Sequence, residues 1–198
     1  MATRQGKRRL PPSARNTGHQ RLLIAVAAVV VVAIAATAVV TRPAPATAQA
    51  CAPTSASIGT GVGQCAPNFT LDNVQGKSVS LSNFHGHPVL IHFWAVGCTT
   101  CAAEYPDFSR IVRAYVPKGL VVLAVDAWGE QPALIRRWQD AHHLPANFLV
   151  DEPQAVVRQY GAPGTPTTFF IDRTGHITAS NSGPLSFGDY QKNLARIV

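Results

Sequence analysis

Two cysteines, Cys98 and Cys101, stand three positions apart behind the apolar run Val89-Leu-Ile-His-Phe-Trp94. A short aliphatic and aromatic run is typical of a buried strand. The cysteine spacing suits the first turn of a helix, so the sequence predicts strand, turn and helix. The N-terminus of that helix offers unpaired N–H groups and the positive end of the helix dipole, which stabilise a thiolate at Cys98. The thiolate attacks a partner's disulfide, and Cys101 then resolves the mixed disulfide.

Two other interpretations of this motif are a zinc half-site and a static disulfide. A zinc site of this kind needs a second pair of ligands at similar spacing, and none follows Cys101 in the chain. We therefore expect no metal, and no cofactor other than the redox-active disulfide Cys98–Cys101 itself.

The excess positive charge is concentrated at the N-terminus. Residues 1–21 contain six Lys/Arg and no Asp/Glu, whereas residues 51–198 contain ten Lys/Arg and ten Asp/Glu. Residues 22–40 are uncharged and apolar, and as a helix they are just long enough to cross the hydrocarbon core of a bilayer. The positive-inside rule keeps residues 1–21 in the cytoplasm and carries everything after residue 40 across the membrane. The net charge of +7 thus indicates topology, and a neutral domain gives no reason to expect a nucleic-acid partner.

The segment 22–40 is expected to be an uncleaved anchor of the cell membrane. The alternative is a cleaved signal peptide, because Ala48-Gln49-Ala50 has the small-x-small pattern of a cleavage site. Either way the domain lies outside the cytoplasm, where disulfides persist. Residues 41–63, rich in Ala, Pro, Thr, Ser and Gly, are expected to form a flexible tether, and residues 64–198 a globular α/β domain.

Hydrophobic periodicity predicts the elements of this domain. They are a hairpin over 68–81, strands over 89–93, 120–125, 147–150, 167–171 and 176–179, and helices over 98–115, 131–142, 154–160 and 187–198. Leu134, Ile135 and Trp138 are expected on the inner face of their helix. His92 is expected to pack or hydrogen-bond within its strand.

The pair Thr165-Pro166 stands directly before a predicted strand, a favourable place for a cis peptide bond. A cis Pro166 would turn the backbone N–H and C=O of Thr165 outward beside the Cys98 sulfur. An extended substrate peptide could then pair with that edge as an added strand. The alternative is an ordinary trans proline in a loop.

Four motifs together resemble a known family. They are Gly63-Gln-Cys-Ala66-Pro67-Asn-Phe69-Thr-Leu71, Phe93-Trp94 with Cys98 and Cys101, Glu104-Tyr-Pro106, and Tyr160-Gly161 with Thr165-Pro166-Thr-Thr-Phe-Phe-Ile171-Asp172. Over about residues 60–198 the chain resembles the membrane-anchored TlpA/ResA group of thiol–disulfide oxidoreductases, of the AhpC/TSA–Redoxin superfamily. The reductases of cytochrome c maturation belong to this group. The resemblance implies an α/β thioredoxin-like fold with an extra N-terminal β-hairpin, here preceded by one transmembrane helix.

The resemblance also implies residue roles. Cys98 would be the nucleophile, Cys101 the resolving thiol and Pro166 the cis proline. Trp94, Thr165 and Pro166 are expected to contact the substrate. The intervening pair Thr99-Thr100 replaces a proline or a charged residue of many relatives. This pair is a main determinant of reduction potential, so the direction of electron transfer stays open.

Glu104 falls one helical turn after Cys101. The resembling family has an acidic residue at this spacing, which is thought to tune the cysteine pKa values or relay a proton. If Glu104 is partly buried, desolvation raises its pKa towards a range useful for proton transfer. The alternative is a solvated surface carboxylate, the fate of most helical glutamates.

Cys51 and Cys65 form a second pair, with 13 residues between them. In an oxidising compartment we expect them to form a structural disulfide, which stabilises the fold by roughly 3 kcal/mol at best. The alternative is a second exchangeable pair that passes electrons to or from Cys98.

The leading hypothesis is therefore a membrane-tethered thiol–disulfide oxidoreductase. Its expected partners are extracytoplasmic cysteine-containing proteins, with apocytochrome c as one candidate, and a membrane thiol–disulfide electron donor or acceptor. One alternative is a peroxiredoxin-type peroxidase, but its P-x-x-x-T-x-x-C signature needs a threonine where Ala95 stands. A second alternative is a non-catalytic binding module. Copper delivery of the Sco type needs a CxxxC spacing and is disfavoured.

Overall fold

The computed structural model describes Cys51 and residues 57–198. The predicted basic N-terminus, the predicted anchor over 22–40 and most of the predicted tether lie outside these residues. Within the described part of the chain, no helix combines the length and the apolar character needed to span a membrane.

Strands and helices follow one another in the order that the sequence predicts. The strands are β1 (Thr70–Asn73), β2 (Ser78–Ser80), β3 (Val89–Trp94), β4 (Val121–Asp126), β5 (Asn147–Val150), β6 (Thr167–Ile171) and β7 (Ile177–Ser182). The α-helices are α2 (Thr99–Tyr115), α3 (Pro132–His142), α4 (Ala155–Tyr160) and α5 (Phe187–Leu194). The described residues also form two 3-10 helices, η1 (Leu81–Phe84) and η2 (Val116–Lys118). The predicted N-terminal hairpin is confirmed, because β1 pairs antiparallel with β2.

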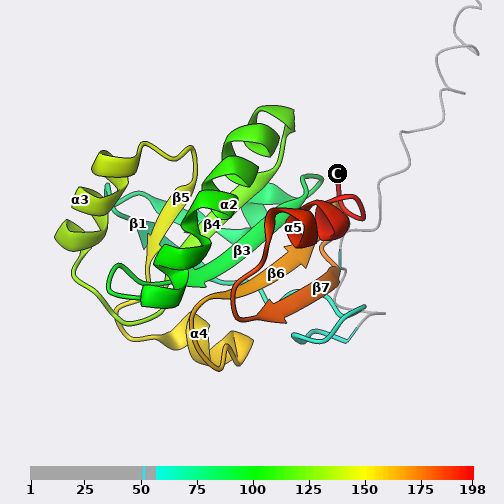
Figure 1. The fold of residues 1–198 in the computed structure, drawn as a ribbon. Coiled ribbons are helices and arrows are strands. Elements are labelled where there is room, and N and C mark those ends of the chain that lie inside the picture. Colours follow the sequence, from blue (N-terminus) through cyan, green and yellow to red (C-terminus); the bar gives the residue numbers. More distant parts are fainter. Residues whose placement is uncertain (1–50, 52–56) are drawn as a thin grey trace, which may run out of the picture. The chain divides into compact units, whose positions relative to one another are not determined.

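The strands form one mixed sheet in the order β2-β1-β5-β4-β3-β6-β7 (Figure 1). The central strand β3 is parallel to β4 and antiparallel to β6. Trp94, the last residue of β3, pairs with Asp126, the last residue of β4. The carboxyl ends of these two strands therefore meet at one edge of the sheet, directly before Cys98.

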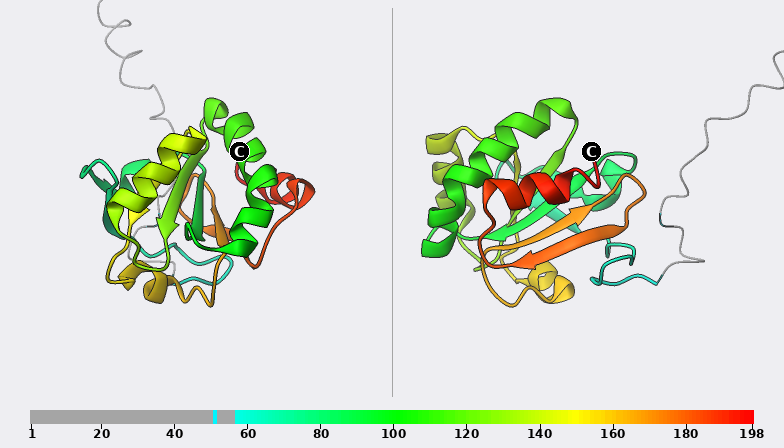
Figure 2. Two further views of the ribbon diagram at one scale, coloured as in Figure 1. Left: turned by 60° about the vertical axis from the view of Figure 1, so that its left-hand side comes forward. Right: turned by 45° about the vertical axis from the view of Figure 1, so that its right-hand side comes forward.

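Alternate strand residues enter two hydrophobic cores, one on each face of the sheet. Leu90 and Phe170 pack in the core that also contains residues of α2 and α5. Ile91 and Phe93 pack in the other core, with residues of α4 and of the N-terminal hairpin. Figure 2 shows α2 and α5 side by side over one face of the sheet. Because both faces are covered, β3 is buried along its whole length, as its continuous apolar run predicts.

Three details differ from the sequence prediction. Helix α5 ends at Leu194 instead of residue 198, and β7 extends to Ser182 instead of residue 179. Leu134, expected on the inner face of α3, is 41% exposed, whereas Ile135 is fully buried. Successive helical residues are roughly 100° apart around the axis, and this offset turns Leu134 away from the core side of α3 on which Ile135 lies.

Candidate active site

Cys98 and Cys101 form a disulfide at the start of α2. Cys98 is the N-cap residue, with an extended backbone, and only Cys101 lies on the first helical turn, which corrects the expectation that both are helical. The Cys98 Sγ accepts the backbone N–H of Cys101 at 3.0 Å. This N–H is one of the unpaired donors of a helix N-terminus, so it can also stabilise a Cys98 thiolate.

The loop before β6 places Thr165 against the same sulfur. The Thr165–Pro166 peptide bond is cis, as the sequence predicts. Thr165 Oγ1 donates to Cys98 Sγ at 3.2 Å, and the Thr165 carbonyl accepts Thr100 Oγ1 at 3.0 Å. The Thr100 hydroxyl also lies 3.3 Å from Cys98 Sγ. In this oxidised form the Thr165 carbonyl thus accepts one hydrogen bond from within the protein.

A cavity of about 250 Å³ reaches both cysteines, which are otherwise well shielded, at 3% and 8% exposure. The lining is largely aromatic: His92, Trp94, Ala95, Val96, Cys98, Cys101, Ala102, Tyr105, Phe108, Ala124, Trp138, His142 and Phe148. Trp94, expected at the substrate, is buried, and within the described part of the chain its Nε1 has no hydrogen-bond partner. Trp94 can therefore contact only a substrate group that enters this cavity.

Glu104 is buried, which rules out the alternative of a solvated surface carboxylate. Its Oε1 accepts the Leu185 N–H at 2.8 Å and the Tyr190 hydroxyl at 2.9 Å. Its Oε2 has no hydrogen-bond partner among the residues that the structure describes, and it lies 3.7 Å from His92 Nε2. Burial raises the pKa of Glu104, although the two hydrogen bonds oppose the change.

His92 connects Glu104 with the cavity. Its ring stacks on Phe108 with centroids 4.2 Å apart, and its Nδ1 lies 3.0 Å from Thr168 Oγ1, so the expected packing and hydrogen bonding are both confirmed. Burial lowers the pKa of His92 to about 3, which keeps the ring neutral. His92 lines the cavity, and Glu104 is not among its lining residues in the described chain. His92 is therefore the titratable side chain that borders both Glu104 and the cysteine cavity.

Glu130 holds the backbone immediately before Cys98. Its Oε2 accepts the Val96 N–H at 2.8 Å, and its Oε1 accepts the Gly97 N–H at 3.3 Å. This carboxylate thus fixes the turn between β3 and α2 and places a negative charge near Cys98. Because it binds backbone groups, no residue pattern in the sequence pointed to it.

Asp126 supports Glu130 from the end of β4. Its buried carboxylate accepts the Trp128 N–H at 3.1 Å and the Glu130 N–H at 2.7 Å. Burial, with a smaller contribution from the Glu130 charge, raises the pKa of Asp126 to about 6. An aspartate that closes an apolar strand was the sequence signal that could have identified it.

Trp128 is a further residue that the sequence motifs did not single out. Its side chain is 51% exposed, and its ring lies against Gly97, where an added Cβ would come within 3.2 Å of it. Gly97 directly precedes Cys98, so this exposed indole offers apolar contact area to a client protein beside the active site.

The second pair, Cys51 and Cys65, also forms a disulfide. Together with His176 these residues place three ligand-type atoms within 4.8 Å of one another. Because the two sulfurs are bonded to each other, they are not metal ligands in this oxidised form. The purely structural role of this disulfide stays a prediction.

Comparison with known proteins decides the family. Residues 62–180 match the AhpC/TSA family. The chain belongs to the AhpC/TSA family. It is 29% identical over 136 residues to the thiol-disulfide oxidoreductase ResA of Geobacillus thermodenitrificans, a match that covers 69% of this chain and 78% of that protein.

Solved structures agree with this assignment. The Chlorobium tepidum protein described as thiol:disulfide interchange protein DsbE is 27% identical, with a TM-score of 0.61 over 70% of this chain and 98% of that one. The exposed lipoprotein thioredoxin of Streptococcus pneumoniae is 28% identical, with a TM-score of 0.58 over 66% of this chain and 100% of that one. This AhpC/TSA member thus has the predicted thioredoxin-like fold and is a thiol–disulfide oxidoreductase of the ResA type.

Proposed function

We propose that this oxidoreductase is anchored in the cell membrane by residues 22–40 and reduces disulfides of extracytoplasmic proteins, apocytochrome c among them. The Cys98 thiolate attacks a client disulfide, and one client sulfur leaves as a thiolate that takes up a proton. Cys101 then attacks Cys98 Sγ and releases the second client sulfur. The Cys98–Cys101 disulfide that remains is the form described above. A dithiol of a membrane partner returns the two electrons.

The reducing direction rests on the acidic surroundings of the cysteine pair. Glu130 accepts the two N–H groups before Cys98, and Asp126 lies behind Glu130. Among the described residues that line the cysteine cavity, none is a lysine or an arginine. Negative charge disfavours a thiolate, so it disfavours the reduced pair relative to the disulfide and makes the dithiol a better electron donor.

The reduction potential of the Cys98–Cys101 couple tests this direction. We expect a value near that of thioredoxin, about −270 mV, and a value near −120 mV would show an oxidant instead. The variant with Cys98→Ala and Cys101→Ala should lose dithiol-dependent insulin reduction. Insulin reduction that persists in that variant would refute the proposed function.

The proposed location rests on the charge-free segment 22–40 behind six basic residues. The Streptococcus pneumoniae relative is described as an exposed lipoprotein. A periplasmic-type phosphatase fused after Val198 should be active in cells and remain in the membrane fraction. The same fusion without residues 22–40 should lose both properties, and an inactive fusion of the full chain would contradict the location.

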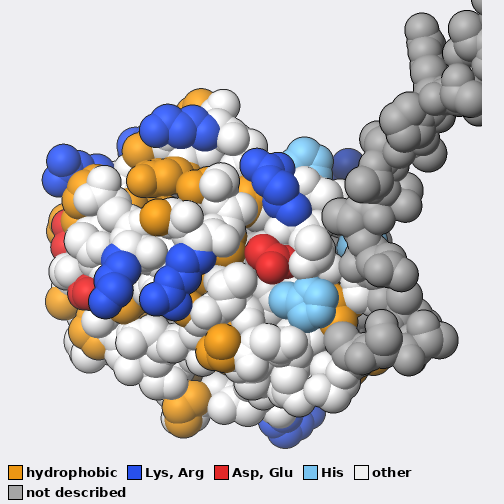
Figure 3. All heavy atoms as spheres, turned by 90° about the vertical axis from the view of Figure 1, so that its right-hand side faces the viewer, with side chains coloured by type: hydrophobic (Ala, Val, Ile, Leu, Met, Phe, Trp, Pro, Cys, Tyr) orange, Lys and Arg blue, Asp and Glu red, His pale blue; other side chains and the backbone are white. Residues whose placement is uncertain are grey.

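Client recognition is expected to depend on short-range contacts. Residues 51–198 are charge-balanced, and on the face seen in Figure 3 basic, acidic, histidine and hydrophobic side chains intermingle, with no broad region of one charge. A charge-balanced domain has little net charge with which to steer a client over long distances. Trp128, exposed beside Gly97, is the side chain that we assign to client contact.

A further inference from the structure

The disulfide Cys51–Cys65 lies at the opposite end of β3 from the active site. Cys65 forms an isolated β-bridge with His176, just before β7, and the cavity beside it is lined by Val89, the first residue of β3. Cys98 follows the other end of this six-residue strand. A strand of this length spans roughly 17 Å, so the two disulfides cannot exchange directly within one molecule. This separation argues against direct transfer within one molecule in the alternative by which Cys51 and Cys65 pass electrons to or from Cys98.

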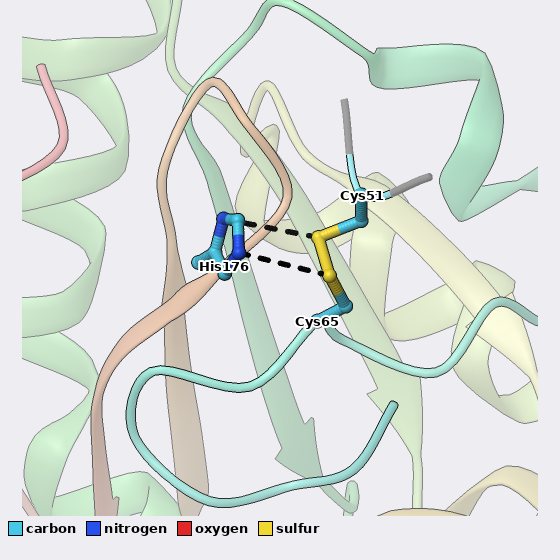
Figure 4. A group of neighbouring side chains, drawn as sticks. All are labelled: Cys51, Cys65 and His176. Atoms are coloured by element: carbon cyan, nitrogen blue, oxygen red, sulfur yellow. Dashed lines mark hydrogen bonds between the residues drawn. A yellow bond between two sulfur atoms is a disulfide. The ribbon is translucent and has the colours of Figure 1, made fainter. Parts of the chain in front are cut away.

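The edge of the His176 ring faces the sulfur–sulfur bond (Figure 4). The ring Nε2 lies 3.7 Å from Cys65 Sγ, and Nδ1 lies 3.8 Å from Cys51 Sγ. An imidazole in this position can hold the proton that stabilises a departing thiolate.

The hydrogen bonds around His176 determine which ring nitrogen carries the proton. Thr174 Oγ1 lies 2.6 Å from Asp172 Oδ1 and donates its only hydrogen to that carboxylate. Thr174 Oγ1 must therefore accept from His176 Nδ1, which lies 2.8 Å away. In the neutral ring the proton is on Nδ1, and the lone pair of Nε2 points to the side of Cys65 Sγ.

The two sulfurs differ in access. Cys65 is 2% exposed, whereas Cys51 is partly exposed. A cavity of about 180 Å³ opens beside the bond, and both cysteines line it with Phe84, His85, His87 and Arg173. An attacking thiol can therefore reach Cys51 more readily, which makes Cys65 the leaving sulfur.

We propose that Cys51–Cys65 is a second thiol–disulfide exchange site, which accepts electrons from a dithiol and uses His176 to hold the Cys65 thiolate. A thiolate of the dithiol attacks Cys51 Sγ, the bond between the two sulfurs breaks, and Cys65 leaves as a thiolate. The second thiolate of the dithiol then attacks the mixed disulfide and closes the dithiol's own disulfide. Two electrons pass to the protein. One dithiol proton ends on Cys51 and the other on His176 Nε2, opposite the Cys65 thiolate.

The full chain carrying Cys98→Ala and Cys101→Ala isolates this site, so the outcome is independent of the proposed active-site function. It is incubated with dithiothreitol in native buffer, quenched with an alkylating agent and mapped by mass spectrometry. We expect the Cys51–Cys65 bond to open under native conditions, about tenfold more slowly after a further His176→Gln substitution. His143→Gln, at an exposed histidine far along the sequence, is the matched control and should not slow the opening.

Further experiments separate an effect on the reaction from an effect on folding. Circular dichroism and urea unfolding establish that His176→Gln is folded, and Thr174→Val keeps the imidazole but removes the acceptor that fixes its Nδ1 proton. Thr174→Val should also slow the opening.

With glutathione as a monothiol probe, the adduct should form on Cys51. Opening only in denaturant, an unchanged rate in folded His176→Gln, or an adduct on Cys65 would each overturn the proposal.

Discussion

His92 Nε2 lies 3.7 Å from Glu104 Oε2, and both side chains are buried. Burial raises the pKa of Glu104 and lowers the pKa of His92 to about 3, so it disfavours the charged form of each. The contact is too long for a hydrogen bond. Burial therefore favours a neutral Glu104 beside a neutral His92. Glu104 lies one helical turn after Cys101 in α2.

Replacing Glu104 with Gln should make the free energy of unfolding less dependent on pH. The pKa of folded Glu104 is raised above its unfolded value of 4.5, so its stabilising contribution is complete below pH 4.5 and is lost as the pH rises through the folded value. Between pH 5 and pH 8, the free energy of unfolding from urea titrations should fall less for the variant than for the wild type. Glu152→Gln, at an exposed carboxylate, should retain the wild-type fall.

Replacing His92 with Gln should weaken acid denaturation. The pKa of folded His92 lies near 3, below its unfolded value of 6.5, so this contribution is present above pH 6.5 and is lost as the pH falls towards 3. In the wild type the loss approaches about 1.4 kcal/mol per pH unit below pH 6. Urea titrations from pH 7 to pH 4 should show a shallower slope for His92→Gln and an unchanged slope for His143→Gln. Equal slopes in all three proteins would contradict the assigned neutral state of His92.

Replacing Glu130 with Gln should make the active-site couple more oxidising. The substitution removes a negative charge next to Cys98, while the amide oxygen still accepts one of the N–H groups of Val96 and Gly97. Dithiothreitol redox titration should give a potential about 15–30 mV less negative, equivalent to about 1 kcal/mol. Glu152→Gln is again the control, and a more negative potential in Glu130→Gln would refute the electrostatic account.

Replacing Thr100 with Val should slow attack by Cys98. The Thr100 hydroxyl lies 3.3 Å from Cys98 Sγ, where it can turn from the Thr165 carbonyl to a thiolate. Loss of a hydrogen bond to a charged group should reduce the rate of Cys98 alkylation by iodoacetamide at pH 7 about tenfold. Thr99→Val, one position earlier on an exposed side chain, should alkylate at the wild-type rate.

Replacing Trp128 with Ala should weaken client binding without harming the fold. Because the indole is half exposed, the free energy of unfolding should change by less than about 1 kcal/mol. The KM for a protein disulfide should rise about tenfold with little change in kcat. Leu134→Ala removes another exposed apolar side chain, on α3, and should leave KM unchanged.

The features that the sequence predicted correctly depend on local patterns. The continuous apolar residues of Val89–Trp94 identify a strand buried on both faces, and the order of the CxxC and Thr165-Pro166 motifs is typical of the thioredoxin fold. Periodicity fails to assign the exposed Leu134, because a residue at the margin of the apolar face of a helix fits the pattern as well as a buried one. It also failed to find the end of α5 at Leu194.

The electrostatics of the site depend on contacts between residues far apart in the sequence. Glu104 is buried and accepts hydrogen bonds from Leu185 and Tyr190, more than eighty residues further along the chain. The residues around Glu104 in the sequence do not predict these contacts. Glu130 likewise accepts the backbone N–H groups of Val96 and Gly97, which almost any residue type could supply. Motifs therefore locate the reacting sulfurs, whereas the surrounding charges emerge only from tertiary packing.

The Leu185 N–H donates to Glu104 Oε1 from the segment that leads into α5. An amide proton is visible in a nuclear magnetic resonance spectrum, and its chemical shift follows the charge on the oxygen that accepts it. The resonance of Leu185 is therefore an intrinsic indicator of the Glu104 protonation state. It can be followed during turnover without a chromophore or any change to the two reacting cysteines.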